Sequence, residues 1–126
     1  MMHLVYVALG GALGASGRHL VGLATVRFFG AGFPLGTFLV NIIGSFLMGV
    51  LFAYLAKKGG ESGTEWRLFL ATGVLGGFTT FSAFSLDAVL LWERGQTSTA
   101  LFYILGSVVL SILALLAGLM LVRAAA

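Results

Sequence analysis

The chain has 126 residues, of which 60% are hydrophobic and 9% are charged, and its mean hydropathy is +1.10. A water-soluble domain carries about 25% charged residues, so this composition excludes that class and indicates an integral membrane protein. The net charge of +3 includes no basic cluster larger than Lys57-Lys58, which argues against a nucleic-acid partner, and the absence of cysteine excludes disulfides and thiol chemistry.

Four apolar segments, at residues 4–29, 35–55, 69–92 and 100–122, are each long enough for the about 20 residues with which a helix crosses a bilayer. The connections are short, so residues 1–126 are predicted to form a single all-α membrane domain of four transmembrane helices. The first segment resembles a secretory signal in its position, but it lacks a basic start and stays apolar past any cleavage site. We therefore expect it to be retained.

Four spans place both termini and the 57–65 connection on one side of the membrane. The basic residues that flank the spans divide unevenly: Lys57, Lys58, Arg67 and Arg123 lie on that side, and Arg27 and Arg94 lie on the other. Four against two is a weak bias under the positive-inside rule. The sequence is therefore compatible with insertion in both orientations.

The first span contains small residues and one charge. Gly10 and Gly14 have the spacing that lets two membrane helices approach closely. Arg18 lies well inside the same segment, where a lipid-facing charge is costly. Two interpretations of Arg18 stay open: a snorkelling side chain or helix-end clamp, and a cation at the mouth of an anion path.

The second and fourth spans each carry a polar stripe with a period of four residues. Pro34 precedes the second span, in which Thr37, Asn41 and Ser45 share one helical face, and Tyr103, Ser107 and Ser111 do the same in the fourth. Such groups often hydrogen-bond neighbouring helices or their own backbone, and they also suit a buried polar ligand. The stripes alone do not decide between these roles.

The third span contains residues 73–87, which combine three glycines, four hydroxyl residues, three phenylalanines and Asp87. Paired glycine followed by Thr-Thr is a poor continuous helix, so we predict that this helix is broken near its middle. Broken backbone is tolerated at membrane depth only where protein buries it or a wet cavity adjoins it. The stretch therefore predicts a polar interior site.

Residues Phe78, Phe81 and Phe84 recur every third position beside these hydroxyls. Ring edges are electropositive and suit an anion, ring faces suit a cation, and a simple packing ridge is the third interpretation. The carboxylates and histidines form no triad and no metal-ligand spacing, so an enzyme is not expected: they are Glu61, Glu65, Asp87, Glu93, His3 and His19.

The chain resembles the Fluc (CrcB) family of fluoride channels. The resemblance rests on Asn41, on Gly-Gly-Phe-Thr-Thr-Phe-Ser-Ala-Phe-Ser at 76–85 and on Gly-x-x-x-Arg at 14–18, and it covers all four spans. The long motif is unusual for a membrane helix and is the specific part. Two positions depart from the family pattern: His19 replaces a common aromatic residue, and Asp87 replaces a frequent glutamate.

The resemblance implies an antiparallel, dual-topology homodimer in the cell membrane that exports fluoride passively through two pores and so confers fluoride resistance. It implies that Phe81 and Phe84 line the pores, that Asn41 donates to the anion, and that further hydroxyls form a polar track: Thr80, Ser82, Tyr103, Ser107 and Ser111. It places Arg18 and Asp87 at the vestibule. It also implies a central structural sodium ion held by the backbone carbonyls of Gly76 and Thr79, which the paired glycines would free.

Two other functions stay open. A small proton-coupled multidrug exporter is also short, four-spanning and antiparallel, but it needs a titratable group at membrane depth, and the charge in the first span is Arg18. A non-conducting assembly subunit is the second, if the polar stripes only join helices. The expected partners are a second copy, fluoride and membrane lipid.

Overall fold

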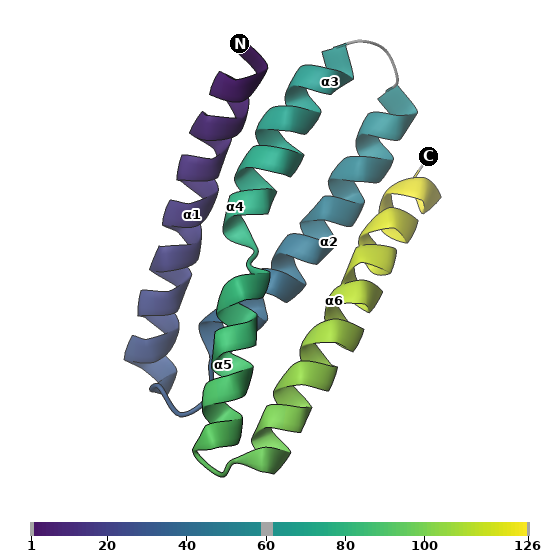
Figure 1. Cartoon of the computed structure of the whole chain (residues 1–126). Coiled ribbons are helices and arrows are strands. Elements are labelled where there is room, and N and C mark those ends of the chain that lie inside the picture. The colour runs from purple at the N-terminus through teal and green to yellow at the C-terminus, as the bar shows by residue number, and fades with distance from the viewer. Residues whose placement is uncertain (1, 59–61, 126) are drawn as a thin grey trace.

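The structure is a computed structural model that describes residues 2–58 and 62–125. This part of the chain is helical, with the elements α1 (Met2–Phe29), α2 (Leu35–Lys58), α3 (Ser62–Trp66), the π-helix η1 (Arg67–Leu75), α4 (Gly76–Phe78), α5 (Phe81–Glu93) and α6 (Thr97–Ala124). The helices lie side by side as one bundle, with both ends of the chain at the same end of it (Figure 1).

Four stretches are long and apolar enough to cross a membrane: Met2–Phe29, Leu35–Lys58, Thr64–Glu93 and Thr97–Ala124. This confirms the four predicted spans, each of which extends a few residues beyond its apolar segment. The helix that leads into the third span begins at Ser62 with α3. Residues 59–61 of the predicted connection lie outside the described residues.

The two tight reversals at the far end of the bundle each contain a glycine in the left-handed region. Gly30 follows α1 with a φ of 82°, and Gly95 follows α5 with a φ of 81°. The Gly30 amide donates to the Val26 carbonyl at 2.9 Å, which closes the last turn of α1. Side chains other than glycine rarely adopt this backbone, so these positions fix short connections.

Small residues bring the helices into backbone contact, as the first-span spacing predicts. A Cβ at Gly10 would lie 2.9 Å from Gly73 Cα, and one at Gly77 would lie 2.7 Å from the Gly11 carbonyl oxygen. The α1 backbone therefore packs directly on η1 and α4. Helices α2 and α6 meet in the same way, because a Cβ at Gly118 would lie 2.9 Å from the Val50 backbone nitrogen.

The buried core is aromatic and lies between α5 and α6. Phe84, Leu91 and Tyr103 are its large members, with Tyr103 fully buried. Phe33 packs edge-on against Tyr103, with their ring centroids 5.4 Å apart and an interplanar angle of 90°. Many other large apolar side chains are exposed on the outer faces, as expected for surfaces that meet lipid or another subunit.

The third span is broken within the predicted stretch, but not at the paired glycines. Gly76 is helical, with φ −63° and ψ −37°, whereas Thr79 (φ −89°, ψ 158°) and Thr80 (φ −154°, ψ 126°) are extended. The break therefore lies two residues after the paired glycines, and the Gly76 carbonyl loses its helical partner because that partner, the Thr80 amide, donates to Asn41. The glycines serve the close approach to α1, and the helix breaks where side chains satisfy the backbone.

Candidate functional site

Asn41 of α2 holds the break in the third span. Its Nδ2 donates to the Thr80 carbonyl at 3.0 Å, and its Oδ1 accepts from the Thr80 amide at 2.8 Å. In a continuous helix that amide would bond to the Gly76 carbonyl four residues earlier. Asn41 therefore replaces the missing helical partner, and one of its two amide hydrogens remains available.

Arg18 of α1 contacts the other side of the break. Its Nε donates to the Gly77 carbonyl at 3.1 Å, near the end of α4. This is the helix-end clamp among the interpretations of Arg18, because a cation beside the last carbonyls of a helix offsets their negative charge. The structure gives Arg18 no place in the cavity that Asp87 lines.

The threonines complete the break. Thr79 Oγ1 donates back to the Leu75 carbonyl at 2.9 Å, and Thr80 Oγ1 accepts from the Ala83 amide at 3.2 Å, which caps the start of α5. Thr80 Oγ1 and Ser82 Oγ also lie 3.3 Å apart. The first turn of α5 thus begins at mid-span with the positive end of its dipole next to this hydroxyl cluster.

A groove of about 260 Å³ runs beside the break and is lined by residues of α2, α5 and α6 and by the break itself. Its lining contains six of the eight residues predicted for an anion path, together with neighbours that include the other break threonine: Asn41, Ser45, Thr79, Thr80, Phe81, Phe84, Ser107, Val108, Ser111 and Ile112. The polar stripes of the second and fourth spans therefore converge on one groove.

Two hydroxyls in this groove have no protein partner. The Oγ atoms of Ser107 and Ser111 are buried, and neither makes a hydrogen bond within the described part of the chain. A buried polar group without a partner costs about 1–3 kcal/mol, so such groups are uncommon in stable proteins. Two on successive turns of α6 mark a place that suits a polar ligand.

The phenylalanines of the predicted ridge separate at the break. Phe78 stays on α4, where its ring approaches Gly17 of α1. Phe81 and Phe84 lie together on α5 with centroids 5.5 Å apart, both lining the groove. Phe84 is 7% exposed, whereas Phe81 is 75% exposed. The groove is therefore open to the outside of the chain on the side where Phe81 lies.

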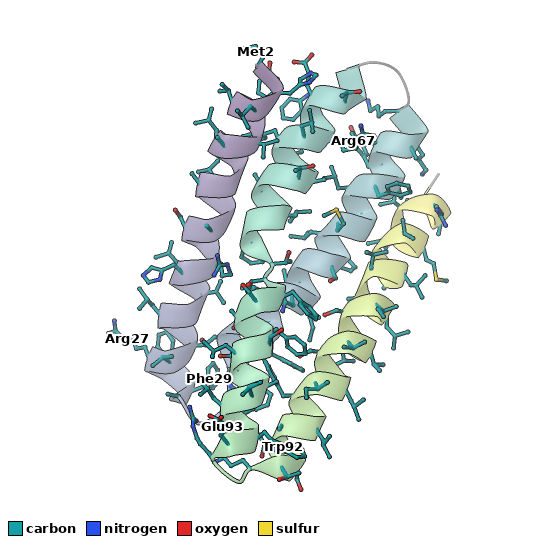
Figure 2. The ribbon with its side chains drawn as sticks, viewed as in Figure 1. Met2, Arg27, Phe29, Arg67, Trp92 and Glu93 are labelled. Carbon is teal, nitrogen blue, oxygen red and sulfur yellow. The ribbon has the colours of Figure 1, made fainter. Side chains whose placement is uncertain are left out.

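Asp87 and Tyr103 form a second site, nearer the far end of the bundle. Tyr103 donates its hydroxyl hydrogen to Asp87 Oδ2 at 3.0 Å. Asp87 also lines a cavity of about 230 Å³ with Thr37 and Arg94. Arg94 was not among the site residues predicted from the sequence, where it counted only towards membrane topology. Its position next to Glu93 at the end of a span was the available indication that it lies near a site. Glu93 and Trp92 mark the same end in Figure 2.

The predicted path residues thus fall into two groups. Six share the groove: Asn41, Thr80, Phe81, Phe84, Ser107 and Ser111. Tyr103 lies outside it and is hydrogen-bonded to Asp87. Ser82 contacts the groove through Thr80. Within the described residues, no cluster of three histidine, cysteine or carboxylate side chains is placed to hold a metal ion.

Comparison with known proteins identifies one family and several close relatives for this chain. The family described as "CrcB-like protein, Camphor Resistance (CrcB)" matches residues 5–119. The chain is 58% identical over 120 residues to the fluoride-specific ion channel FluC of Cereibacter sphaeroides, covering 95% of this chain and 94% of that one. It is 54% identical over 122 residues to the fluoride-specific ion channel FluC 2 of Nitrobacter hamburgensis, covering 97% and 98%.

Proposed function

The chain belongs to the CrcB-like protein family, and from that premise we propose that it is a fluoride-specific ion channel through which fluoride leaves the cell passively. The observation that carries the proposal is the similarity, over 95% of this chain, to proteins named as fluoride-specific channels. The chain's four long apolar helices make it a multi-pass membrane protein, and we expect it to transport an ion rather than to catalyse a reaction. We place it in the cell membrane, where passive exit of fluoride would confer resistance.

The groove supplies the chemistry that fluoride requires. A small anion loses its water shell in a narrow path only if fixed donors replace that shell. The partnerless hydroxyls of Ser107 and Ser111 and the remaining amide hydrogen of Asn41 are such donors on one wall. The rings of Phe81 and Phe84 stand on the α5 wall, where electropositive ring edges would add to them.

The broken helix adds a favourable field. The N-terminus of α5 lies at Thr80 beside the groove, and a helix N-terminus carries about half a positive charge. Half-helices in transporters point this end at anionic substrates. Thr80 and Ser82 offer hydroxyls at the same place. Selection against larger halides then follows from the fixed spacing of the donors.

A second copy would complete the path. Phe81 is 75% exposed, so the groove in one chain lacks a wall that a partner can supply. The family resemblance and the small difference in basic residues between the two ends support an antiparallel, dual-topology homodimer with a pore on each side. The open side of the groove is poorly suited to face lipid, because polar groups line the groove.

The carbonyls of Gly76 and Thr79 fit a structural sodium ion. The amide that would bond to the Gly76 carbonyl donates to Asn41, and the amide that would bond to the Thr79 carbonyl donates to the Thr80 hydroxyl, so both oxygens lack a helical partner. Carbonyls freed at a helix break coordinate sodium in transporters. A hard cation takes about six or more oxygens, so a partner chain would contribute the remainder. Bound there, the ion would supply fixed positive charge at the centre of the assembly.

The cavity lined by Asp87 and Arg94 is our candidate vestibule. A carboxylate repels anions, and its hydrogen bond from Tyr103 together with the nearby Arg94 reduces that repulsion. Arg18, which the family resemblance places at the vestibule, acts in our proposal as the clamp on Gly77. It then contributes to the path by fixing the break.

The relatives and the structure give no support to the multidrug exporter. Helix α1 contains no aspartate or glutamate, and the relatives carry the fluoride-channel name. A non-conducting assembly subunit gives no reason for the two buried serine hydroxyls that lack a hydrogen-bond partner. Measured flux separates these functions directly.

The test is fluoride efflux from liposomes that contain the purified chain, followed with a fluoride electrode. We expect fluoride to leave rapidly when an ionophore balances the charge, and chloride to be retained under the same gradient. Protein that passes chloride as readily as fluoride, or neither ion, contradicts the proposal. Replacing sodium with N-methylglucamine during purification tests the cation, because it is expected to lower both dimer fraction and flux.

A further inference from the structure

We propose that a pocket between α2 and the start of the third span binds the headgroup and upper acyl chain of an anionic phospholipid. The pocket has a volume of about 370 Å³. One wall is apolar and comes from α2, through Leu51, Phe52 and Leu55, and the other is polar and comes from α3 and η1, through Thr64, Arg67 and Thr72. The proposal depends only on insertion in a bilayer and not on the fluoride activity.

The pocket lies at the depth of lipid headgroups. Arg67 is near the start of the Thr64–Glu93 span, and α2 ends at Lys58 on the same side of the bundle. Figure 2 labels Arg67 at this end, over the gap between the third span and α2. The apolar wall then extends from the headgroup level towards the hydrocarbon, as an amphipathic lipid requires.

The charge at this end favours an anion. Glu65 lies close to Arg67 in sequence but faces α1, where its Oε2 accepts a hydrogen bond from Tyr6 at 2.8 Å. Arg67 lines the pocket on the other side of the helix, and Lys57 and Lys58 are exposed at the end of α2. A planar guanidinium binds phosphate through two parallel hydrogen bonds, and clustered basic residues attract anionic lipid.

The π-helix η1 brings the residues of the polar wall onto one face. In a π-helix the hydrogen bonds run from residue i to i+5, so residues four and five apart follow one another along the axis. Arg67 is therefore aligned with Ala71 and Thr72, and all three line the pocket. The threonine hydroxyls supply further donors to phosphate oxygens, and Ala71 leaves room for the chain beneath.

Native mass spectrometry of the full chain in neutral detergent tests the proposal, with phosphatidylglycerol as the probe and phosphatidylcholine of the same acyl chains as comparison. We expect phosphatidylglycerol to bind more tightly, and Arg67→Gln to lower its affinity at least about fivefold, which corresponds to the about 1 kcal/mol of one basic residue at an anionic surface. Arg123→Gln is the matched control, because Arg123 is an exposed basic residue at the same end outside the pocket.

A second variant separates charge from folding. Ala71→Leu keeps every charge and fills the pocket, so it should also weaken phosphatidylglycerol binding, while fluoride efflux from phosphatidylcholine vesicles stays unchanged in both variants. Inorganic phosphate at millimolar concentration should not displace the lipid, because it lacks the chain that the α2 wall receives.

Four outcomes overturn the proposal. The first is equal affinity for the two lipids, and the second is an Arg67→Gln loss no greater than that of Arg123→Gln. The third is a fall in dimer fraction for Arg67→Gln and Ala71→Leu with lipid affinity unchanged, which would make the pocket a contact between copies of the chain. Displacement by inorganic phosphate alone would reduce it to a simple anion site and would equally reject the lipid.

Discussion

Replacing Asn41 with leucine tests the account of the broken helix. Leucine has the same branched arrangement of side-chain heavy atoms but no hydrogen-bonding group, so the amide and the carbonyl of Thr80 would both lose their partner in a partly buried place. A continuous helix cannot satisfy them, because Thr80 is extended with a ψ of 126°. The variant therefore removes two bonds and leaves two backbone groups unsatisfied.

The size of the effect follows from these two bonds. An unsatisfied buried backbone group costs about 1–3 kcal/mol in soluble proteins, and interhelical hydrogen bonds in a membrane protein average about 0.6 and reach about 1.7 kcal/mol. Two lost bonds predict that Asn41→Leu lowers the free energy of unfolding by about 2 kcal/mol. Fluoride flux should fall with it, since the start of α5 and the groove depend on the same bonds.

The assay is unfolding by sodium dodecyl sulfate in mixed micelles, followed by far-ultraviolet circular dichroism, with fluoride efflux measured in parallel. Ser45→Ala is the matched control, because Ser45 lies one helical turn from Asn41 and lines the same groove. We expect its unfolding to match the wild type. If Asn41→Leu unfolds like Ser45→Ala but loses flux, Asn41 acts only on the ion and the reasoning about the break is refuted.

Three further predictions concern the rings, the glycines and the serines. Phe81→Ile and Phe84→Ile should both reduce fluoride flux and leave dimers intact. Only Phe84→Ile should also lower the free energy of unfolding, by about 1 kcal/mol or more, because Phe84 is buried and Phe81 is exposed. Normal flux in both variants would show that the rings only pack. Gly14→Ala should prevent folding, since the added Cβ would overlap the backbone of the third span. Gly11→Ala should raise the free energy of unfolding by up to about 1 kcal/mol, because no atom lies within 4 Å of the added Cβ and alanine favours a helix more than glycine does. Equal yields of folded protein from the two variants contradict this. Ser107→Ala should raise stability by about 1 kcal/mol while lowering flux, and a loss of stability would reveal an unrecognised structural bond.

Composition and spacing were sufficient for the spans and for the faces that carry polar groups. The length of an apolar run determines whether it can cross a bilayer, and a period of four residues places Ser107 and Ser111 on one face of α6 whatever surrounds them. Sequence also predicted that the third span is broken within residues 73–87, since glycine and threonine both weaken a helix there.

The position of the break and the partners of the polar groups depended on how helices cross. Gly77 is equally consistent with unwound backbone and with close packing, and only the position of the α1 backbone shows that it packs. Asn41 could be assigned to the anion or to another helix, and its two bonds to Thr80 show that it does the second with one hydrogen to spare. Arg18 likewise clamps Gly77, a role that requires knowing which carbonyl lies opposite.

The glycine contacts between helices have a consequence for how this chain tolerates change. Exposed outer positions such as Leu13, Leu105 and Leu113 meet an apolar environment that any aliphatic side chain suits, so a library of random variants should accept many residues there. Positions such as Gly10, where one added carbon would collide with main chain, should accept almost none. Deep mutational scanning should therefore show strict positions as narrow lines along the helix seams, separated by broad permissive faces.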